Sequence, residues 1–481
     1  MANFHKLLHK LLDKLLDKSL CLLYNNLETE ALEKTLAYSF PQQSPSRLSF
    51  GTMMNEFRQV IGQFPDKRTG QNTTYSMEDI ALGAFSVFFT QSPSFLAHQT
   101  AMTEAKGISN AQTLFGLHAI PSDNHIRKIL DVVPPQEVFP MFENVLNALN
   151  ELGHLQAFRA FDEQLLIALD GTQYHSSNNI LCENCSVKEH RNGQTSYSHT
   201  VITPVIVSPG RKQVLPLEPE FITPQDGHEK QDCETEAAKR WISQHGARYG
   251  ALNTTLLGDD LYSRQPLCEQ VLAAGLNFIF VCKAQSHPTL YDWLDGLNTA
   301  QAVETLIVER RKGKKRETDT YRFVNQVPIR DHDDALRVNW CELITTGSDG
   351  KVIYRNAFIS NHRISADNVV AMVAAGRARW KVENENNNTL KTKGYHLSHN
   401  FGHGKQHLST LLVSLNLLAF LFHTVLDMMD CKYQLIRAAL PTRKTFFDDI
   451  RALTRYLCFD SFDAMLDFML RGLKIEAPDT G

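Results

Sequence analysis

LLIALDGTQYHSS (residues 165–177) opens with five apolar residues and then has one carboxylate, Asp170, before glycine and small polar residues. A short apolar run that ends at such turn-forming residues is typical of a buried β-strand. A single carboxylate at a strand end is more often a turn or a helix cap than a functional group. Asp170 therefore has to be judged by the acidic residues that the rest of the chain brings to it.

Four further strand patterns follow, with two helical patterns between them. The strand patterns cover residues 196–210, 212–224, 254–260 and 277–283, and the helical patterns cover residues 230–250 and 266–275. The order β-β-β-α-β-α-β is that of a ribonuclease-H-like fold, a five-stranded mixed α/β sheet whose first and fourth strands are neighbours. We expect this domain to comprise residues 158–286 and 364–407.

The remaining regions are predicted to be separate units. Residues 287–363 have strand-like, charged segments and are expected to form a β-rich insertion, whereas residues 49–157 and 408–481 have helical patterns. Residues 1–48 contain an amphipathic Leu-rich helix, interpreted as a docking or self-association element, and a linker. The apolar run at 411–426 is interrupted by polar residues and is short for a membrane span, which favours a buried helix.

The composition is that of a soluble globular protein with more than one domain. The chain has 481 residues, of which 43% are hydrophobic and 21% charged, so two or three domains are expected. The net charge of −4 excludes a uniformly basic surface, and any DNA contact needs local basic patches. Nine cysteines without a disulfide-like spacing, and no signal peptide, indicate the cytoplasm.

Three acidic positions are candidates for one metal site. Asp170 ends the first strand, and Asp259 or its neighbour Asp260 ends the fourth. The helical pattern after the insertion adds Glu383 or Glu385. Converging carboxylates repel one another unless cations lie between them, and hard oxygen ligands favour Mg²⁺ or Mn²⁺. Two such ions can activate a water or a 3′-hydroxyl for attack on a phosphodiester.

Helical geometry favours Glu383 over Glu385 as the third acid. At 100° per residue, Glu383 lies about 40° from Arg379, whereas Glu385 lies about 120° from it. Glu383 is also close to Trp380, which is expected at the buried edge of the helix. Glu383 is therefore the first choice and Glu385 the second.

The blocks ALDGT, LLGDDLYSRQ and RWKVENENNNTLK resemble the three signature motifs of DDE transposases from bacterial insertion sequences. The similar branch is the cut-and-paste group, whose catalytic domain carries a β-strand insertion between the second Asp and the Glu. The resemblance covers about residues 158–407. It implies that Asp170, Asp259 and Glu383 are the catalytic metal ligands, because the second Asp precedes Tyr262 by three residues and the Glu follows RWKV.

The same resemblance implies how the protein acts on DNA. The basic residues that handle DNA ends in this family fall on Arg379 and Lys391. Members cleave DNA at the inverted-repeat ends of their element in a metal-dependent reaction and join the freed 3′-hydroxyl to target DNA, as a dimeric protein–DNA assembly. A homodimer on double-stranded DNA, with Mg²⁺ or Mn²⁺, is therefore expected.

The chain departs from the family pattern at three positions. Gly376 stands where a Tyr is usual, three residues before Arg379. Lys391 follows Glu383 by eight residues, where a spacing of seven is usual. Asn387 stands in place of an aromatic residue.

Two regions are candidates for contacting DNA. The segment RRKGKKR (residues 310–316) has six cations in seven residues; it is either a solvated hairpin tip or a phosphate-contacting loop that makes binding salt-dependent. The residues proposed for that contact are Arg310, Arg311, Lys314 and Lys315. Recognition of the element's ends is expected in the helical residues 49–157, where Arg127 and Lys128 lie on a predicted helix.

A second metal site is suggested by CENCSVKEH (residues 182–190). Cys182 and Cys185 have the spacing of a zinc-binding Cys-x₂-Cys pair, and His190 and His199 follow. Two thiolates and two imidazoles would complete a structural Zn²⁺ site, and soft sulfur ligands argue against the catalytic ion at this place. The alternative is a surface loop with two free cysteines.

Two other functions remain compatible with the sequence. One is a transposase-derived DNA-binding protein that has lost its chemistry and acts as a repressor or structural factor. The other is a Mg²⁺-dependent nuclease of the same fold that cuts DNA without joining it. Strand transfer to a target distinguishes the transposase from this nuclease.

Overall fold

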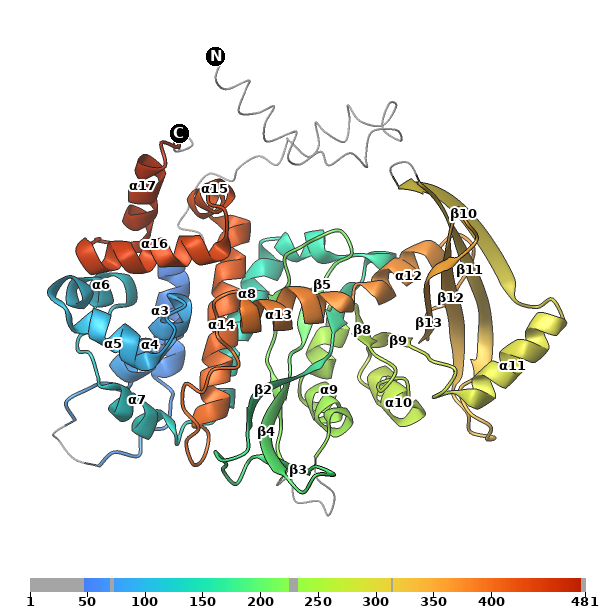
Figure 1. The fold of residues 1–481 in the computed structure, drawn as a ribbon, viewed down its shortest axis with the longest axis horizontal. Helices are drawn as coiled ribbons and strands as arrows, with labels where there is room; N and C mark the ends of the chain where they lie inside the picture. Colours follow the sequence, from blue (N-terminus) through green and yellow to red (C-terminus); the bar gives the residue numbers. More distant parts are fainter. Residues whose placement is uncertain (1–46, 70–72, 225–231, 313–314, 477–481) are drawn as a thin grey trace, which may run out of the picture.

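The computed structural model describes residues 47–69, 73–224, 232–312 and 315–476 as a mixed α/β protein with 47% helix and 20% strand. The amphipathic helix and most of the linker expected in residues 1–48 lie outside these residues. Within them, a helical unit occupies one end of the molecule, a mixed sheet the middle, and the strands of the predicted insertion the other end (Figure 1).

The helical unit is built from both flanking regions, which share one core. Phe85 contacts Phe422 at 5.2 Å between ring centroids, and Phe50 contacts Phe462 at 4.5 Å. The two helical regions predicted as separate units therefore pack as one. The N-terminal helices are α3 (Phe50–Ile61), α4 (Met77–Phe89), α5 (Phe95–Thr103), α6 (Ala105–Phe115), α7 (Asp123–Leu130) and α8 (Phe139–Glu151). The C-terminal helices are α14 (Leu408–Met429), α15 (Cys431–Ala439), α16 (Arg443–Tyr456) and α17 (Phe462–Gly472).

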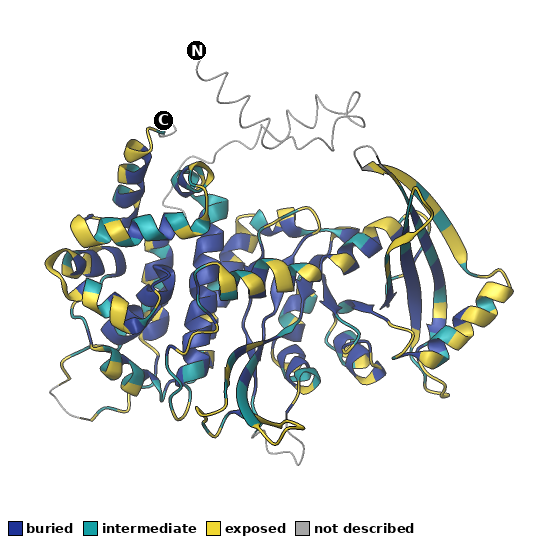
Figure 2. Cartoon of the chain, in the orientation of Figure 1, coloured by how far each residue is buried: buried dark blue, intermediate teal, exposed yellow. Residues whose placement is uncertain are grey.

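Helix α14 is the central element of this unit. Among the described residues it is the one helix long and apolar enough to cross a membrane, yet 94% of its most apolar window is buried within the protein. Figure 2 shows it as a continuous dark-blue segment among the surrounding helices. The burial agrees with the core helix predicted from the sequence.

The large sheet in the described chain has the order β10-β11-β12-β13-β9-β8-β1-β5-β6. Strand β1 (Leu165–Ala168) pairs in parallel with β8 (Thr254–Gly258), which pairs in parallel with β9 (Asn277–Val281). On the other side, β5 (Val205–Val207) is antiparallel to β1, and β6 (Leu215–Pro216) is antiparallel to β5. The first and fourth predicted strands are therefore neighbours, as expected.

Two of the predicted strands are in fact each divided between two sheets. The pattern at 196–210 forms β4 (Thr195–Ile202) and β5, and the pattern at 212–224 forms β6 and β7 (Glu220–Ile222). β4 and β7 belong to a small sheet with β2 (Gly171–Ser177) and β3 (Ser186–Glu189). Pro204 separates β4 from β5, because proline has no N–H to continue a strand ladder.

The predicted insertion extends the large sheet and does not form a separate unit. Its strands are β10 (Glu304–Lys312), β11 (Lys315–Pro328), β12 (Arg337–Gly347) and β13 (Val352–Ser360), and β13 pairs antiparallel with β9. Its first segment is a helix, α11 (Pro288–Thr299), which the expectation of a β-rich insertion missed. Pro288 at the first helical position suits a helix start, since the missing N–H has no intrahelical partner there.

Helices cover both faces of the central strands. In Figure 1, α9 (Glu234–Ala251) and α10 (Gln265–Ala273) lie on one side, and α12 (Val369–Arg377) and α13 (Asn388–Thr392) on the other. A π-helical turn, η4 (Val382–Asn387), lies between α12 and α13. The helical pattern predicted after the insertion is therefore interrupted at the position of the acidic candidates.

His98 makes the stability of the helical unit depend on pH. Burial, with a smaller effect of Arg451, lowers the pKa of His98 from 6.5 to about 3. Its ring nitrogens contact the hydroxyls of Ser86 and Ser92 at 2.8 and 3.0 Å, which neutral imidazole satisfies. As the pH falls, His98 is therefore protonated near pH 6.5 in the unfolded chain, whereas in the folded chain it remains neutral at that pH.

We expect the free energy of unfolding to fall as the pH drops from 6.5 toward 3, by up to about 1.4 kcal/mol per pH unit for this group. Urea unfolding at about pH 7.5 and about pH 5 should show a loss about 2 kcal/mol larger in the wild type than in His98→Gln. Equal losses in the two proteins would contradict the assignment to His98.

Candidate active site and metal centre

Asp170 and Asp259 lie at the same level on neighbouring parallel strands. Ala168 of β1 pairs with Leu257 of β8, and each aspartate follows its paired residue by two positions. Neighbouring strands are about 4.8 Å apart, so both carboxylates lie at one edge of the sheet. Asp170 also stands where the chain leaves β1 for β2, between the two sheets, and its carbonyl accepts a hydrogen bond from the Thr203 backbone N–H.

The electrostatics of Asp170 connect it to the other predicted acids. Burial, and after it the negative charges of Glu234, Asp259 and Glu383, together raise its pKa to about 7, while the positive charge of Arg379 opposes them. Arg379 is itself buried, and its Nη1 lies 3.8 Å from Asp170 Oδ1. The site thus gathers more negative charge than its arginine balances.

Asn387, which stands in place of the usual aromatic residue, contacts Asp170 directly. Its Nδ2 donates a hydrogen bond to Asp170 Oδ2 at 3.2 Å, and its Oδ1 accepts one from Thr203 Oγ1 at 2.8 Å. Asn387 is buried, so this chain of hydrogen bonds fixes the orientation of the Asp170 carboxylate. An aromatic residue at this position would remove that donor.

The π-helical turn accounts for the unusual position of Lys391. In η4 the Asn388 N–H donates to the Glu383 carbonyl, a bond between residues five apart where an α-helix uses four. One extra residue is thereby absorbed between Glu383 and Lys391. Burial lowers the pKa of Lys391 and the charge of Asp170 opposes this, so the lysine lies within electrostatic range of Asp170 despite its spacing of eight.

Asp260, the alternative to Asp259, is engaged elsewhere. Its Oδ1 accepts a hydrogen bond from the Lys283 backbone N–H at 2.6 Å, and its Oδ2 accepts one from the Ser286 hydroxyl. Both partners lie in the segment after β9. Asp259 Oδ1 accepts only a local bond, from the Leu261 N–H at 2.8 Å, and its charge acts on Asp170. The geometry favours Asp259 as the second acid.

Glu234 is a fourth carboxylate beside Asp170, and no sequence pattern predicted it. It is the first residue of α9, and its Oε1 accepts hydrogen bonds from the Gly171 N–H at 3.1 Å and the Tyr262 hydroxyl at 2.8 Å. A Cβ at Gly171 would lie 2.5 Å from Glu234 Oε2, so a larger residue there would displace the Glu234 carboxylate from its present position. The sequence gives little sign of it, since an acid in the first turn of a helix is common.

The expectation that Trp380 is buried is wrong. Trp380 is 47% exposed, and Arg379, the residue before it, is the buried one. The Arg379 guanidinium lies 5.0 Å from the centre of the Trp380 ring, so the indole covers the cation from outside. Glu383 is exposed and Glu385 half-buried, and the charge of Glu383 is the one felt by Asp170.

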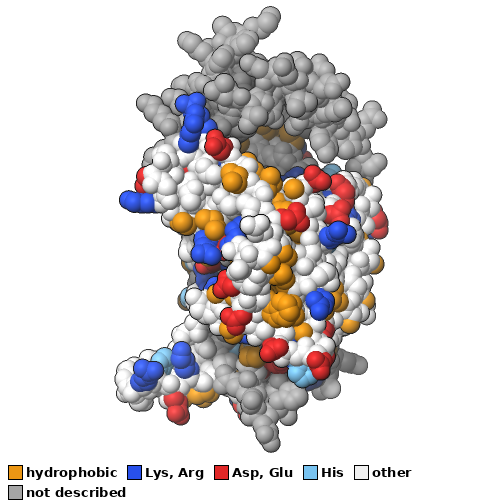
Figure 3. Space-filling model, turned by 90° about the vertical axis from the view of Figure 1, so that its right-hand side faces the viewer, with side chains coloured by type: hydrophobic (Ala, Val, Ile, Leu, Met, Phe, Trp, Pro, Cys, Tyr) orange, Lys and Arg blue, Asp and Glu red, His pale blue; other side chains and the backbone are white. Residues whose placement is uncertain are grey.

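The basic segment 310–316 is only partly described. Lys314, and the side chain of Lys315, lie outside the described residues. Arg311 is exposed, while Arg310 pairs with Asp319 at 2.9 Å and with Glu317 at 3.1 Å. Figure 3 views this end of the molecule and shows Lys and Arg interspersed with Asp and Glu around a band of apolar side chains. The charge of Arg310 is therefore balanced within its own sheet.

Arg127 and Lys128 lie where the helical unit meets the segment before α14. The Arg127 Nε donates a hydrogen bond to the Phe401 carbonyl at 3.0 Å. Both residues line an open pocket of about 540 Å³ together with Lys405 and the backbone of Gly404. Arg127 thus has a structural partner, whereas Lys128 faces the open pocket.

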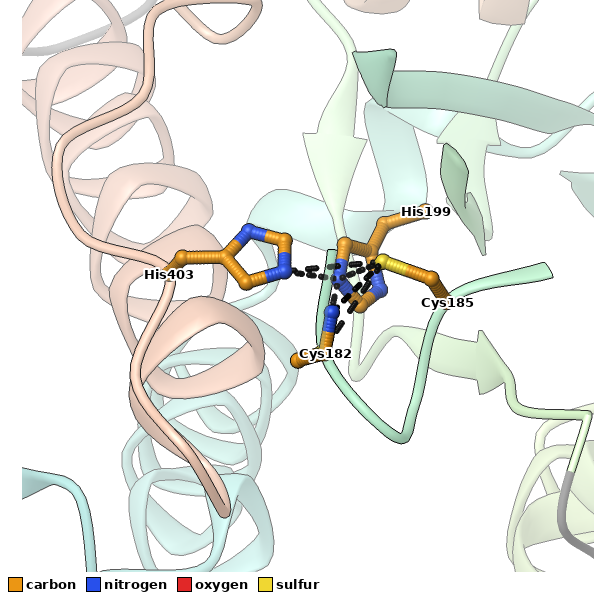
Figure 4. Close-up of side chains that lie close together, drawn as sticks. All are labelled: Cys182, Cys185, His199 and His403. Carbon is orange, nitrogen blue, oxygen red and sulfur yellow. Dashed lines mark hydrogen bonds between the residues drawn. The ribbon is translucent and has the colours of Figure 1, made fainter. Parts of the chain in front are cut away.

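A compact group of metal-ligand residues forms a second site. The thiols of Cys182 and Cys185 and the imidazoles of His199 and His403 place their ligand atoms within 4.8 Å of one another. Figure 4 shows His403 reaching from the segment before α14 toward the other three side chains, which come from the small-sheet region. These four residues could hold a metal ion.

The predicted ligand His190 does not belong to this group. Its Nε2 contacts Ser196 Oγ at 2.8 Å on the exposed end of the β3–β4 hairpin. His403, more than 200 residues after His199, stands in the position assigned to His190. Spacing along the chain selects ligands that are close in sequence, and it gave no sign of a ligand from a distant segment.

A further acidic group is occupied by an arginine. Glu143, Glu218 and His245 also have ligand atoms within 4.8 Å of one another. Arg248 lies 2.5 Å from Glu143 Oε1 and 2.5 Å from Glu218 Oε1. The guanidinium already pairs with both carboxylates, so this group is an ion-pair network.

No protein-family model matches this sequence, and no curated protein matches it.

Proposed function

We propose that this chain is a DDE transposase of a bacterial insertion sequence, with a ribonuclease-H-like catalytic domain. The observation that carries the proposal is that Asp170 and Asp259 follow adjacent parallel strands at the same level, and that the helical segment carrying Glu383 contacts Asp170 through Arg379 and Asn387. The strand order β6-β5-β1-β8-β9, with β5 alone antiparallel to both of its neighbours, is the one expected for this fold and supports the proposal.

The donor set fits a hard divalent cation. Asp170, Asp259 and Glu383 offer carboxylate oxygens, which suit Mg²⁺ or Mn²⁺, and their mutual repulsion is what a bound cation would relieve. When bound, such ions would supply Lewis acidity for phosphodiester hydrolysis and for attack by a 3′-hydroxyl.

The surrounding residues have positioning and charge-balancing roles in this proposal. Asn387 and Thr203 hold the Asp170 carboxylate in place, and Glu234 fixes the Gly171 backbone beside it. Arg379 and Lys391 place positive charge next to the carboxylates, where a DNA phosphate would otherwise be repelled. The substrate is double-stranded DNA, bound by a homodimer in the cytoplasm.

Cleavage of the element's own ends tests the proposal. A duplex carrying the sequences that flank this gene should be nicked at the element boundary with Mg²⁺ or Mn²⁺ but not with EDTA, and the freed 3′-hydroxyl should join a target plasmid. Cutting without joining would identify a nuclease. Salt-sensitive binding without cleavage in either metal would identify a DNA-binding relic.

A further inference from the structure

We propose that Cys182, Cys185, His199 and His403 bind one structural Zn²⁺ that fastens the small sheet to the helical unit. The site is separate from the carboxylates and does not depend on the proposed DNA chemistry. It joins two parts of the chain that the sequence places more than 200 residues apart.

The distances between the ligand atoms are those of a tetrahedral zinc site. With bonds of about 2.3 Å to sulfur and about 2.0–2.1 Å to nitrogen, a tetrahedron requires about 3.8 Å between sulfurs, about 3.6 Å between sulfur and nitrogen, and about 3.3–3.4 Å between nitrogens. The sulfurs of Cys182 and Cys185 are 3.9 Å apart, and the two His Nε2 atoms are 3.4 Å apart. Three sulfur–nitrogen pairs measure 3.4, 3.5 and 3.5 Å.

Hydrogen bonding alone does not account for this arrangement. Each of the four ligand atoms carries at most one hydrogen, yet five pairs among them lie at 3.4–3.9 Å. At least one pair would therefore face each other without a hydrogen between them. A shared cation attracts all four atoms to one point and removes this conflict.

The ligand set indicates a closed, structural site. Two thiolates and two neutral imidazoles fill all four positions of a tetrahedral ion and leave none open for water or substrate. Thiolate ligands select Zn²⁺ over Mg²⁺, so the site would not compete for the catalytic ion. The two negative thiolates also balance the charge of the metal.

The segment that carries His403 is held from two sides. The Asp131 carboxylate, at the end of α7, accepts backbone N–H bonds from Lys405, Gln406 and Leu408 at 3.0–3.1 Å. Asn184, between the two cysteines, donates to the Gln406 carbonyl at 2.9 Å. A Zn²⁺ at this place would join the loop that carries Cys182 and Cys185 to the segment that precedes α14 and lies against the end of α7. This loop belongs to the small sheet, whose strand β2 begins directly after Asp170, so the metal would also support the acidic site.

Metal analysis of the full-length protein, purified without a metal-affinity step, tests the proposal. We expect about one Zn²⁺ per chain and, after exchange for Co²⁺, thiolate-to-cobalt charge-transfer absorption. His403→Ala and Cys185→Ser should lose the metal, whereas His190→Ala, the matched control, should retain it. In the wild-type protein, Cys182 and Cys185 should resist alkylation until a zinc chelator is added, whereas the exposed Cys233 and Cys458 should react without it.

Three results would overturn the proposal. One is wild-type protein without zinc whose Cys182 and Cys185 react freely with alkylating reagents. Another is a Cys182–Cys185 disulfide in protein purified under reducing conditions suited to thiols. The third is loss of zinc in His190→Ala to the same extent as in His403→Ala, which would place the ligand in the hairpin. None of these measurements includes DNA, so they are independent of the transposase proposal.

Discussion

Asp170→Asn is expected to lower metal-dependent cleavage of the element's ends by about 10²–10³-fold while the protein still binds DNA. Loss of one electrostatic stabiliser of a transition state costs about 10²–10³ in rate, and Asp170 is the acid on which the charges of Glu234, Asp259 and Glu383 converge. The same substitution removes a buried repelled charge, so folding should be unchanged or slightly improved. Single-turnover cleavage and urea unfolding measure the two effects.

Asp260→Asn is the matched control for this prediction. It makes the same chemical change in the residue next to Asp259. The Asp260 carboxylate, however, accepts hydrogen bonds from the Lys283 N–H and the Ser286 hydroxyl, in the segment after β9. Cleavage by Asp260→Asn should stay within about tenfold of the wild type, with a modest loss of stability from the broken hydrogen bonds. If Asp170→Asn cleaved normally and Asp260→Asn did not, the assignment of the acids would be wrong.

Gly376→Tyr, which restores the residue usual in the resembling family, is expected to destabilise the protein by about 3 kcal/mol or more. A Cβ at Gly376 would lie 2.8 Å from Phe358 Cε1 and 3.0 Å from Ile279 Cγ2. Helix α12 packs against β9 and β13 at this point, and a phenol ring there would lift the helix off the sheet. Because Glu383 follows on the same helical segment, cleavage should fall together with stability.

Val370→Tyr provides the comparison on the same helix. Val370 is 41% exposed, so a tyrosine there should change the free energy of unfolding by no more than about 0.5 kcal/mol. Urea midpoints and soluble yields of the two variants report the difference. A stable, active Gly376→Tyr protein would contradict the close packing of α12 on the sheet.

The sequence predicted the elements that depend on local patterns. Hydrophobic runs predict three of these elements without knowledge of their tertiary contacts. They are the strand that ends before Asp170, the strand that ends before Asp259, and the buried helix α14. Their order along the chain was enough to expect the first and fourth strands side by side, because parallel strands joined through helices pack in a limited set of orders.

The features that the sequence did not predict depend on tertiary contacts, which local sequence patterns do not reveal. The division of residues 196–210 between two sheets, the π-helical turn at Val382–Asn387 and the exposure of Trp380 each depend on which surface the segment meets. Glu234 approaches Gly171 only because α9 begins beside the end of β1.

The candidate metal centre separates most clearly what the sequence predicts from what only the tertiary structure shows. Cys182, Cys185 and His199 are close enough in sequence for their spacing to identify them, and the sequence determined these three. His403 was decided by the tertiary structure alone, since Asp131 and Asn184 hold its segment against the cysteine loop. The position of such a ligand in space depends on how distant segments pack. That packing is driven mainly by burial of apolar surface, which spacing along the chain does not reveal.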